Sequence, residues 1–353
     1  MKTSYLRHIS LGPLLWLAAC GGDDGTTTPP APSLLGPLEA TMDATILPAL
    51  DQMATEATAA RTAAEAMCSA PDEARLTALQ DSWRDLYEAY NRAGAYGFGP
   101  LDDDPIVPRI YFIDPMRQRG TDYTETVRAT LTQALTDPTM LTADDVDALT
   151  FNRVGLIALE VLSFEATTSS QSTAAANIVA QLGDADACTY LTGVARGLES
   201  RSQAVAEEWK TPSADGPSFR DRMATANLPD GSDPVATLLL GLLDYTDYVK
   251  TRKLEGLLDA QLAGHFYPGV LAGLSGVRAT LDAPDGFLSL LEPRGDEAVA
   301  DAVRAALTAA EQRAEAQDRD GLATEIGRLE GLIRRDLADA LFVTLGINFT
   351  DGD

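Results

Sequence analysis

The sequence predicts an all-α protein built as two antiparallel helical bundles. Apolar residues recur at intervals of three and four in both halves of the chain, for example at Leu76, Leu79, Trp83 and Leu86. Hydrophobic residues make up 45% of the chain and aromatic residues only 6%, which favours helices over a β-sandwich. No segment alternates like a strand over a useful length. Two bundles would give each apolar stripe a packing partner.

The first 19 residues have the pattern of a lipoprotein signal peptide. Lys2 and Arg7 give a basic start, and a short apolar run follows from residue 9 to residue 19. This run is too short to span a bilayer but has the length of a secretory signal. The sequence LAAC at its end resembles a bacterial lipobox, so we expect Cys20 to be lipidated. The alternative is an ordinary cleaved signal followed by an incidental cysteine.

Residues 20–36 are expected to form the lipidated cysteine and a flexible tether. The sequence GTTTPPAPS in this segment is polar and Pro-rich, so it has no means of packing a core. By analogy with bacterial lipoproteins, Gly21 after the cysteine indicates the outer membrane. No other window holds 18 uninterrupted apolar residues, so we expect no transmembrane helix. The predicted location is the cell envelope, with a lipid anchor in the outer membrane and the protein facing the periplasm.

The chain is strongly acidic, with a formal net charge of −26 at pH 7. Its first 19 residues hold two basic residues and no acid, so the remainder carries −26 − 2 = −28. Such a chain repels phosphate backbones, which excludes nucleic acid as a partner. The acidity serves either solubility in an exposed compartment or the attraction of cations, and both interpretations stay open.

The body of the chain divides into two predicted bundles. The N-terminal bundle covers residues 37–212, a Pro- and Gly-rich linker covers 213–232, and the C-terminal bundle covers 233–353. Within the first bundle, residues 97–115 form a long loop, and long loops in compact domains are often functional.

Capping residues mark several helix ends. Ser69 and Thr142 are expected to cap helix N-termini, Ser232-Asp233-Pro234 opens another helix, and Gly346 is expected to stop the last one. The other predicted helices cover residues 38–67 with an interruption at Pro48, 71–96, 142–165, 186–210, 267–282, 296–317 and 318–345.

Two cysteines remain besides Cys20. An oxidising periplasm permits a disulfide between Cys68 and Cys188. The bridge would close a loop of 188 − 68 = 120 residues and contribute about 4–5 kcal/mol in the chain-entropy model. Two buried free thiols are the alternative. Neither cysteine has a neighbouring Cys or His, so they do not have the pattern of metal ligands.

The stretch NRVGLIALEVLSFE, residues 152–165, combines a nearly continuous apolar surface with two unusual residues. If it forms one helix, that helix is buried on most sides. Gly155 then costs about 1 kcal/mol relative to Ala, and Glu160 would be a buried carboxylate that needs a partner.

Several patches together resemble the imelysin-like family of bacterial envelope proteins, also called peptidase family M75. They occur in the family's order over about residues 40–345, and the lipoprotein leader is usual there. The resemblance implies an all-helical fold of two bundle-like halves and a link to iron or haem acquisition. The patches are LQDSWRDLYEAYNRAGAYGFGP, FIDP, NRVGLIALEVLSF, CTYLTGVARGLESRSQAVAEEW, TRKLEGLL and GLSGVRATLD.

The hallmark of that family is a Gly-x-His-x-x-Glu motif on a buried helix. Gly155 and Glu160 match the motif, but Ile157 stands at the position of the histidine. His and Glu three residues apart can reach one ion from the same helix face, and an isoleucine supplies no donor. The sequence therefore predicts the frame of a site that has lost its imidazole.

Two carboxylates are the candidate metal ligands. Glu160 either pairs with an Arg, a Lys or a helix end as a structural residue, or contacts a ligand in a pocket between the bundles. Asp114, in FIDP, is either a turn or cap residue or a second pocket carboxylate that faces Glu160. Oxygen ligands suit hard cations. The sequence therefore predicts no definite cofactor, and iron or another cation is the metal that these carboxylates could bind.

The basic residues offer fewer candidates. Arg278 is the best counter-ion for a buried acid, because Arg makes bidentate pairs, and a surface position is the alternative. We expect Lys253 at the surface, the run 102–104 in a solvated acidic loop, and His265 solvated in a loop flanked by Gly and Pro. After removal of the predicted signal peptide, which contains His8, His265 is the one histidine left, and this excludes zinc or haem sites built on two or three histidines.

The predicted function is non-catalytic binding. We expect an envelope lipoprotein that binds a small ligand or cation, or a partner in iron or haem acquisition, with Gly155, Ile157, Glu160, Asp114 and Arg278 around the ligand. The alternative is an interaction module that has lost its metal site. A metallopeptidase is the third candidate, although its metal-bound water needs a ligand set that Ile157 cannot complete. No HExxH motif, nucleophile elbow or phosphate-binding loop is present.

Overall fold

The computed structural model describes residues 33–137, 141–167, 171–214, 216–256 and 259–346. The predicted signal peptide, Cys20 and most of the tether lie outside these ranges. The described residues contain helices, two isolated β-bridges and no strand, so the predicted all-α fold is confirmed. No helix among them is long and apolar enough to cross a membrane.

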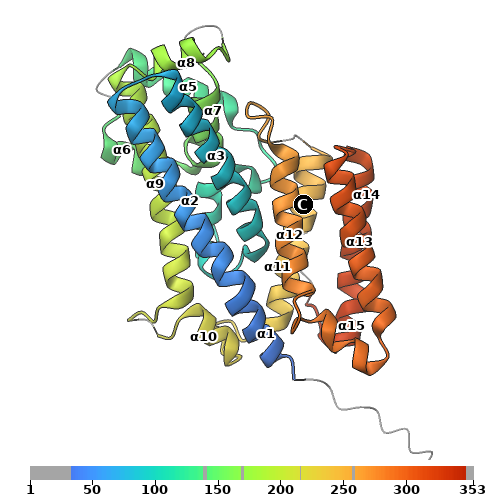
Figure 1. Ribbon diagram of the computed structural model, residues 1–353. Coiled ribbons are helices and arrows are strands. Elements are labelled where there is room, and N and C mark those ends of the chain that lie inside the picture. The colour runs from blue at the N-terminus through green and yellow to red at the C-terminus, as the bar shows by residue number, and fades with distance from the viewer. Residues whose placement is uncertain (1–32, 138–140, 168–170, 215, 257–258, 347–353) are drawn as a thin grey trace, which may run out of the picture. The chain divides into compact units, whose positions relative to one another are not determined.

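Fifteen α-helices, α1 to α15, lie in the described part of the chain (Figure 1). The first nine are Leu35–Thr41, Leu47–Ser69, Glu73–Ala93, Arg109–Ile113, Thr124–Thr136, Ala143–Asp147, Gly155–Phe164, Ala175–Gln181 and Ala185–Lys210. The remaining six are Phe219–Ala224, Pro234–Asp247, Phe266–Leu281, Glu297–Glu315, Arg319–Gly331 and Ala338–Leu341. Three π-helical segments, η1 (Met42–Ile46), η7 (Tyr248–Leu254) and η10 (Leu332–Leu337), continue α-helices.

The first group of helices packs around α2, α3 and α9. Helix α2 contacts both of the others along its length, and α7 packs against α3, α5 and α9 (Figure 1). The amphipathic pattern of α3 explains this arrangement, because the predicted apolar positions Leu76, Leu79, Trp83 and Leu86 are all buried. A disulfide joins Cys68 at the end of α2 to Cys188 near the start of α9.

The second group consists of α11, α12, α13 and α14. Helix α13 packs against α12 and α14, and α11 contacts α14. Helix α12 also packs against α3, so the two groups share one hydrophobic core. The described residues accordingly form one compact unit, and the linker predicted at 213–232 contains α10. The division into two domains at that linker stays a prediction.

The predicted helix 142–165 is wrong as one continuous element. Thr142 does cap a helix, with a capping box to Asp145, but α6 ends at Asp147. Helix α7 begins at Gly155, which has a positive φ of 83°. Gly155 is therefore the first residue of a helix and does not lie in a helix interior.

Smaller differences concern the helix ends. The first helix begins at Leu35, inside the predicted tether. The side chain of Asp72, and not Ser69, caps α3 by accepting a hydrogen bond from the Arg75 backbone N–H. The last helix ends at Leu341, where Phe342 takes the left-handed conformation predicted for Gly346.

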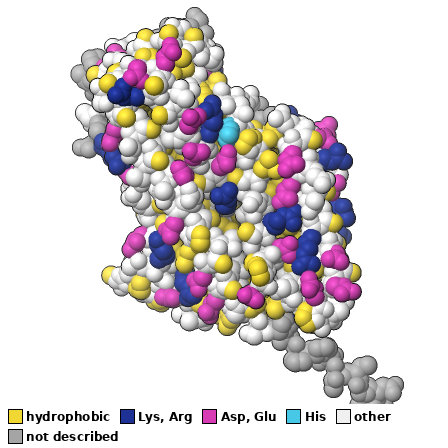
Figure 2. Space-filling model, viewed as in Figure 1, with side chains coloured by type: hydrophobic (Ala, Val, Ile, Leu, Met, Phe, Trp, Pro, Cys, Tyr) yellow, Lys and Arg dark blue, Asp and Glu magenta, His cyan; other side chains and the backbone are white. Residues whose placement is uncertain are grey.

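Charges of both signs are mixed over the face shown in Figure 2. Acidic and basic side chains lie close together there. The partly exposed arginines Arg61, Arg220 and Arg304 each pair with an acid. The large net charge therefore does not produce a single uninterrupted acidic surface on this side.

Candidate functional site

Gly155 fixes the position of α7 against the segment before it. A Cβ atom at this residue would lie 2.6 Å from the carbonyl oxygen of Ile113 and 2.9 Å from that of Phe112. Real Cβ atoms do not approach backbone oxygens this closely, and the positive φ is also unfavourable for side chains. Only glycine therefore lets α7 begin beside α4.

Helix α7 is buried on nearly all sides, as its composition predicts. Nine of its ten residues are buried, and Ile157 is the exception. The indole N–H of Trp83 donates a hydrogen bond of 3.0 Å to the Leu156 carbonyl, which ties α7 to α3. This packing directs residues 157 and 160, which share a helix face, into one cavity.

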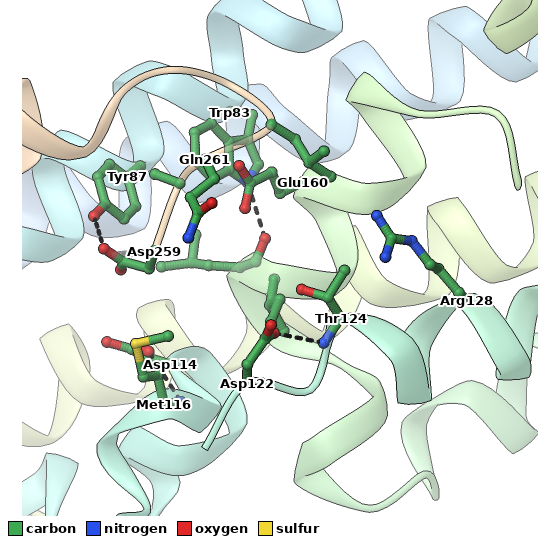
Figure 3. Close-up of a pocket in the computed structure, with 14 residues that line it drawn as sticks. Trp83, Tyr87, Asp114, Met116, Asp122, Thr124, Arg128, Glu160, Asp259 and Gln261 are labelled. Atoms are coloured by element: carbon green, nitrogen blue, oxygen red, sulfur yellow. Dashed lines mark hydrogen bonds between the residues drawn. The ribbon is translucent and has the colours of Figure 1, made fainter. Parts of the chain in front are cut away.

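The cavity has a volume of about 200 Å³ and lies between α3, α5, α7 and the loop before α12 (Figure 3). Carboxylates, two aromatic rings and several apolar side chains surround it. The lining residues are Trp83, Tyr87, Asp114, Met116, Asp122, Thr124, Arg128, Leu156, Ile157, Glu160, Asp259, Ala260, Gln261 and Leu262.

Glu160 is buried in this cavity, and none of the described residues forms an ion pair with it. Its side chain is 6% exposed, and its Oε1 atom accepts a hydrogen bond of 3.0 Å from the Ala263 backbone N–H. Burial raises the pKa of this carboxyl to about 8. The nearby Asp259 and Asp122 carboxylates also raise this pKa, whereas the backbone hydrogen bonds to Glu160 lower it. Glu160 is therefore largely protonated at neutral pH when the cavity holds no cation.

Asp259 forms a buried ion pair at one side of the cavity. Its carboxylate lies 2.6 Å from the Lys253 ammonium and accepts a hydrogen bond of 2.7 Å from the Tyr87 hydroxyl. Burial raises the pKa of Asp259 and the Lys253 charge opposes this rise. Lys253 also lies over the rings of Tyr87 and Tyr248, with its Nζ atom 5.4 Å and 4.9 Å from their centroids.

Asp114 combines the two roles that the sequence left open. It caps a short 3₁₀ turn by accepting a hydrogen bond of 3.2 Å from the Met116 backbone N–H, and it also lines the cavity. Its other carboxylate oxygen accepts a hydrogen bond of 2.7 Å from the Tyr248 hydroxyl. The π-helix η7 thus supplies both Tyr248 and Lys253 to the site.

Asp122 and Arg128 complete the polar lining on the side of α5. Asp122 accepts a hydrogen bond of 2.8 Å from the Thr124 backbone N–H (Figure 3). Arg128 is already engaged outside the cavity, because it makes a bidentate pair with Glu165 at 2.8 Å and 2.5 Å. The Glu165 carboxylate therefore neutralises most of the Arg128 charge.

The structure brings four of the predicted site residues together and separates the fifth. Gly155 positions α7, and Ile157, Glu160 and Asp114 line the cavity. Arg278 was expected as the counter-ion of a buried acid, but it does not line the cavity. It forms a bidentate pair with Glu311 between α12 and α13, at 2.8 Å and 2.7 Å.

The expectation for Lys253 is wrong, and His265 is less exposed than expected. Lys253 is fully buried, because Asp259 and two tyrosine rings surround its ammonium group. His265 is only partly exposed, and its Nε2 atom lies 2.7 Å from the Glu88 carboxylate. The acidic run 102–104 is exposed, as predicted.

Sequence reasoning missed Asp122, Asp259 and Tyr87 as site residues. Tyr87 has the spacing of an ordinary core position, and both aspartates lie in loops without a recognisable motif. They reach the cavity through contacts between distant parts of the chain, which a single sequence does not reveal.

Residues 46–344 match the protein family described as imelysin. The chain is a member of the imelysin family. An imelysin-like protein from Psychrobacter arcticum 273-4 has a similar structure, with a TM-score of 0.71 and 18% identity over 90% of this chain and 99% of that one. A putative iron-regulated protein A precursor from Parabacteroides distasonis ATCC 8503 also has a similar structure, with a TM-score of 0.57 and 15% sequence identity. The match covers 89% of this chain and 96% of that one. No curated protein matches the sequence significantly.

The side chains at the imelysin motif position do not fit a metal centre in this chain. Ile157 replaces the histidine of the motif, and it lines the same cavity as Glu160. Among the residues that the structure describes, no three His, Cys, Asp or Glu side chains come together as a ligand set for one metal ion. Protein metal sites usually need at least three such ligands.

Proposed function

We propose that this imelysin-family protein is a non-catalytic binding protein whose ligand is a small cation held in the cavity around Glu160. The uncompensated burial of Glu160 is the observation that carries the proposal. A carboxylate in an enclosed site costs free energy unless a cation or several hydrogen-bond donors accompany it. Glu160 has a backbone donor and two acidic neighbours, so a cation that entered the cavity would lower the energy of its ionised form.

The proposal assigns no catalysis to the cavity. Hydrolysis by a metallopeptidase needs a metal-bound water and a ligand set that holds the ion open on one side. Ile157 supplies no donor to such a set. The nearest histidine in the described residues, His265, is bound to Glu88.

The proposed location is the outer membrane, facing the periplasm. The leader and the tether around Cys20 support a lipid anchor. A disulfide between Cys68 and Cys188 suits an oxidising compartment. Metabolic labelling with a radioactive fatty acid tests the anchor, and a Cys20→Ala variant that keeps the label would contradict it.

A second candidate function is an interaction module in iron or haem acquisition. It draws on the similar Parabacteroides protein, which is described as a putative iron-regulated protein A precursor. Here the cavity would be a remnant, and the protein would bind another envelope protein. Pull-down from detergent-solubilised membranes of iron-starved cells tests this candidate, with a Cys20→Ala variant and iron-replete cells as controls.

Titration calorimetry of the full chain tests the cation-binding proposal directly. The ligands are Fe³⁺, Cu²⁺, Ca²⁺, haem and a set of small organic amines. Each ligand is titrated into the wild-type protein and into the Glu160→Gln variant. We expect at least one cation to bind and its affinity to fall by about tenfold or more in the variant, since one charge-assisted contact is lost. No heat with any of them, and no shift of the thermal midpoint, would refute the proposal.

A further inference from the structure

Three carboxyl groups around the cavity form no ion pair with any residue that the structure describes. Among the described residues, ion pairs involve neither Asp114, Asp122 nor Glu160, and each accepts hydrogen bonds only from uncharged donors. The one arginine of the lining is engaged by acids outside the cavity. These three carboxyl groups therefore remain available to an incoming cation, which would favour the ionised form of Glu160.

Other side chains of the lining are apolar. Met116, Leu156, Ile157 and Leu262 contribute aliphatic surface, and Trp83 adds an aromatic ring. Ile157 lies one turn before Glu160 on α7, so one ligand can contact both side chains. A fully hydrated ion gains nothing from this surface, whereas a ligand with a charged end and a short apolar body gains from both parts of the lining.

The chain itself shows how this environment binds an alkylammonium group. The Lys253 ammonium is fully buried beside the cavity, where it is held by the Asp259 carboxylate and lies over the rings of Tyr87 and Tyr248. Carboxylate and aromatic ring together are the usual recognition chemistry for organic ammonium ions. Asp259 and Tyr87 also line the cavity, so the same chemistry is available to a ligand.

We propose that the ligand of the Glu160 cavity is a small primary amine in its ammonium form, with its charged end at Glu160 and Asp122 and its apolar body against Ile157. This inference rests on the proposed cation-binding function and narrows it to a ligand class. A cavity of about 200 Å³ suits a molecule smaller than a typical drug. A metal ion would require a convergent ligand set, which the described residues do not provide.

Binding of an ammonium ion is coupled to proton release from Glu160. Burial raises the pKa of Glu160 to about 8, and a cation beside the carboxylate restores its ionised form. An alkylamine remains protonated throughout the range from pH 6 to pH 8. Its affinity should therefore rise by about 50-fold between these values, following the ionised fraction of Glu160. The charged or titratable groups that line the cavity with Glu160 are Tyr87, Asp114, Asp122, Arg128 and Asp259, and Lys253 pairs with Asp259 beside the cavity.

The experiment compares amines with alcohols of the same shape. Pentylamine and phenethylamine, together with 1-pentanol and 2-phenylethanol, are titrated calorimetrically into the full chain at pH 6, 7 and 8. We expect one amine to bind per chain with an affinity that increases with pH, and we expect neither alcohol to bind measurably. Fe³⁺ and Ca²⁺ as simple salts are titrated in parallel.

Two variants locate the binding site and one serves as a control. Glu160→Gln keeps an acceptor for the Ala263 backbone N–H, and Asp122→Asn keeps one for Thr124, so both preserve the local hydrogen bonds. Each should weaken amine binding by about tenfold or more. Glu311→Gln makes the same chemical change at the Arg278 pair, away from the cavity, and should leave binding unchanged.

The outcomes separate the ligand class from the proposed function. Alcohols that bind as well as amines, or amine binding unaffected by both cavity variants, would overturn the inference. Binding of a metal ion alone, lost in Glu160→Gln, would overturn the amine and leave cation binding in place. No binding of any cation would overturn both.

Discussion

Replacing Glu160 by glutamine should stabilise the protein, and increasingly so as the pH rises. The pKa of Glu160 is about 8 in the folded protein, against an ordinary value of 4.5. The unfolded chain therefore releases this proton near pH 4.5, whereas the folded protein keeps it until about pH 8. Folding becomes less favourable across that window, and the cost is fully present above pH 8. The glutamine side chain has no proton to lose and retains the acceptor for the Ala263 backbone N–H.

The size of the effect follows from the pKa difference. Each pH unit in the window corresponds to about 1.4 kcal/mol. The difference in free energy of unfolding between Glu160→Gln and the wild-type protein should therefore increase by roughly 3–4 kcal/mol in favour of the variant from pH 5 to pH 8. Reversible guanidinium denaturation at pH 5, 6, 7 and 8, without added ligand, measures this difference. Much of the gain should disappear when a saturating cationic ligand is added, because the ligand stabilises only the carboxylate form.

A matched carboxylate provides the control for this experiment. Glu311 forms a half-buried ion pair with Arg278, so Glu311→Gln should lower the free energy of unfolding slightly at neutral pH, by at most about 1 kcal/mol. The two substitutions therefore have opposite signs. A stability difference for Glu160→Gln that stays constant from pH 5 to pH 8 would show that its folded pKa is ordinary, and the reasoning about the cavity would be wrong.

Three further substitutions test the frame of the site. Gly155→Ala should lower the free energy of unfolding, measured by denaturant titration, by about 3 kcal/mol or more. The reason is that the new Cβ atom would lie 2.6 Å from the Ile113 carbonyl oxygen, at a residue with a positive φ. A loss below about 1 kcal/mol would contradict this close packing. Lys253→Met should cost about 3–5 kcal/mol in the same assay, since Asp259 loses its buried partner, and a neutral effect would mean that the pair is dispensable. Ile157→His should bind Zn²⁺ at least about tenfold more tightly than the unchanged chain in calorimetry, as it places an imidazole on the cavity face of α7; equal affinities would show that the other ligands of the family site are missing.

The helical fold was predictable because the periodic apolar residues dominate local structure. The stripe at Leu76, Leu79, Trp83 and Leu86 is buried in α3 as expected. The break between α6 and α7 was not predictable from periodicity, since apolar residues continue across it. That break depends on Gly155 approaching the backbone of α4, a contact between segments that lie about 40 residues apart in the sequence.

The site was predictable only in part, for a related reason. The family resemblance pointed to Gly155 and Glu160, and FIDP pointed to Asp114. Lys253, in the segment TRKLEG, was expected at the surface. The chain there continues α11 as a π-helix, which changes the face that each residue presents and turns Lys253 towards Asp259.

The three motif positions have separable physical roles, and this separation explains how the frame can persist when one residue changes. Gly155 is required by the backbone of α4 whether or not a ligand binds. Glu160 is held by the loop before α12 through Ala263 and supplies the negative charge. Position 157 lines the cavity and takes part in neither of these contacts, so its side chain can change without disturbing them. An imidazole there would favour a metal ion, whereas Ile157 favours an apolar body beside a charged end. In the proposed mode of binding, this single position therefore selects the class of cation that the cavity binds.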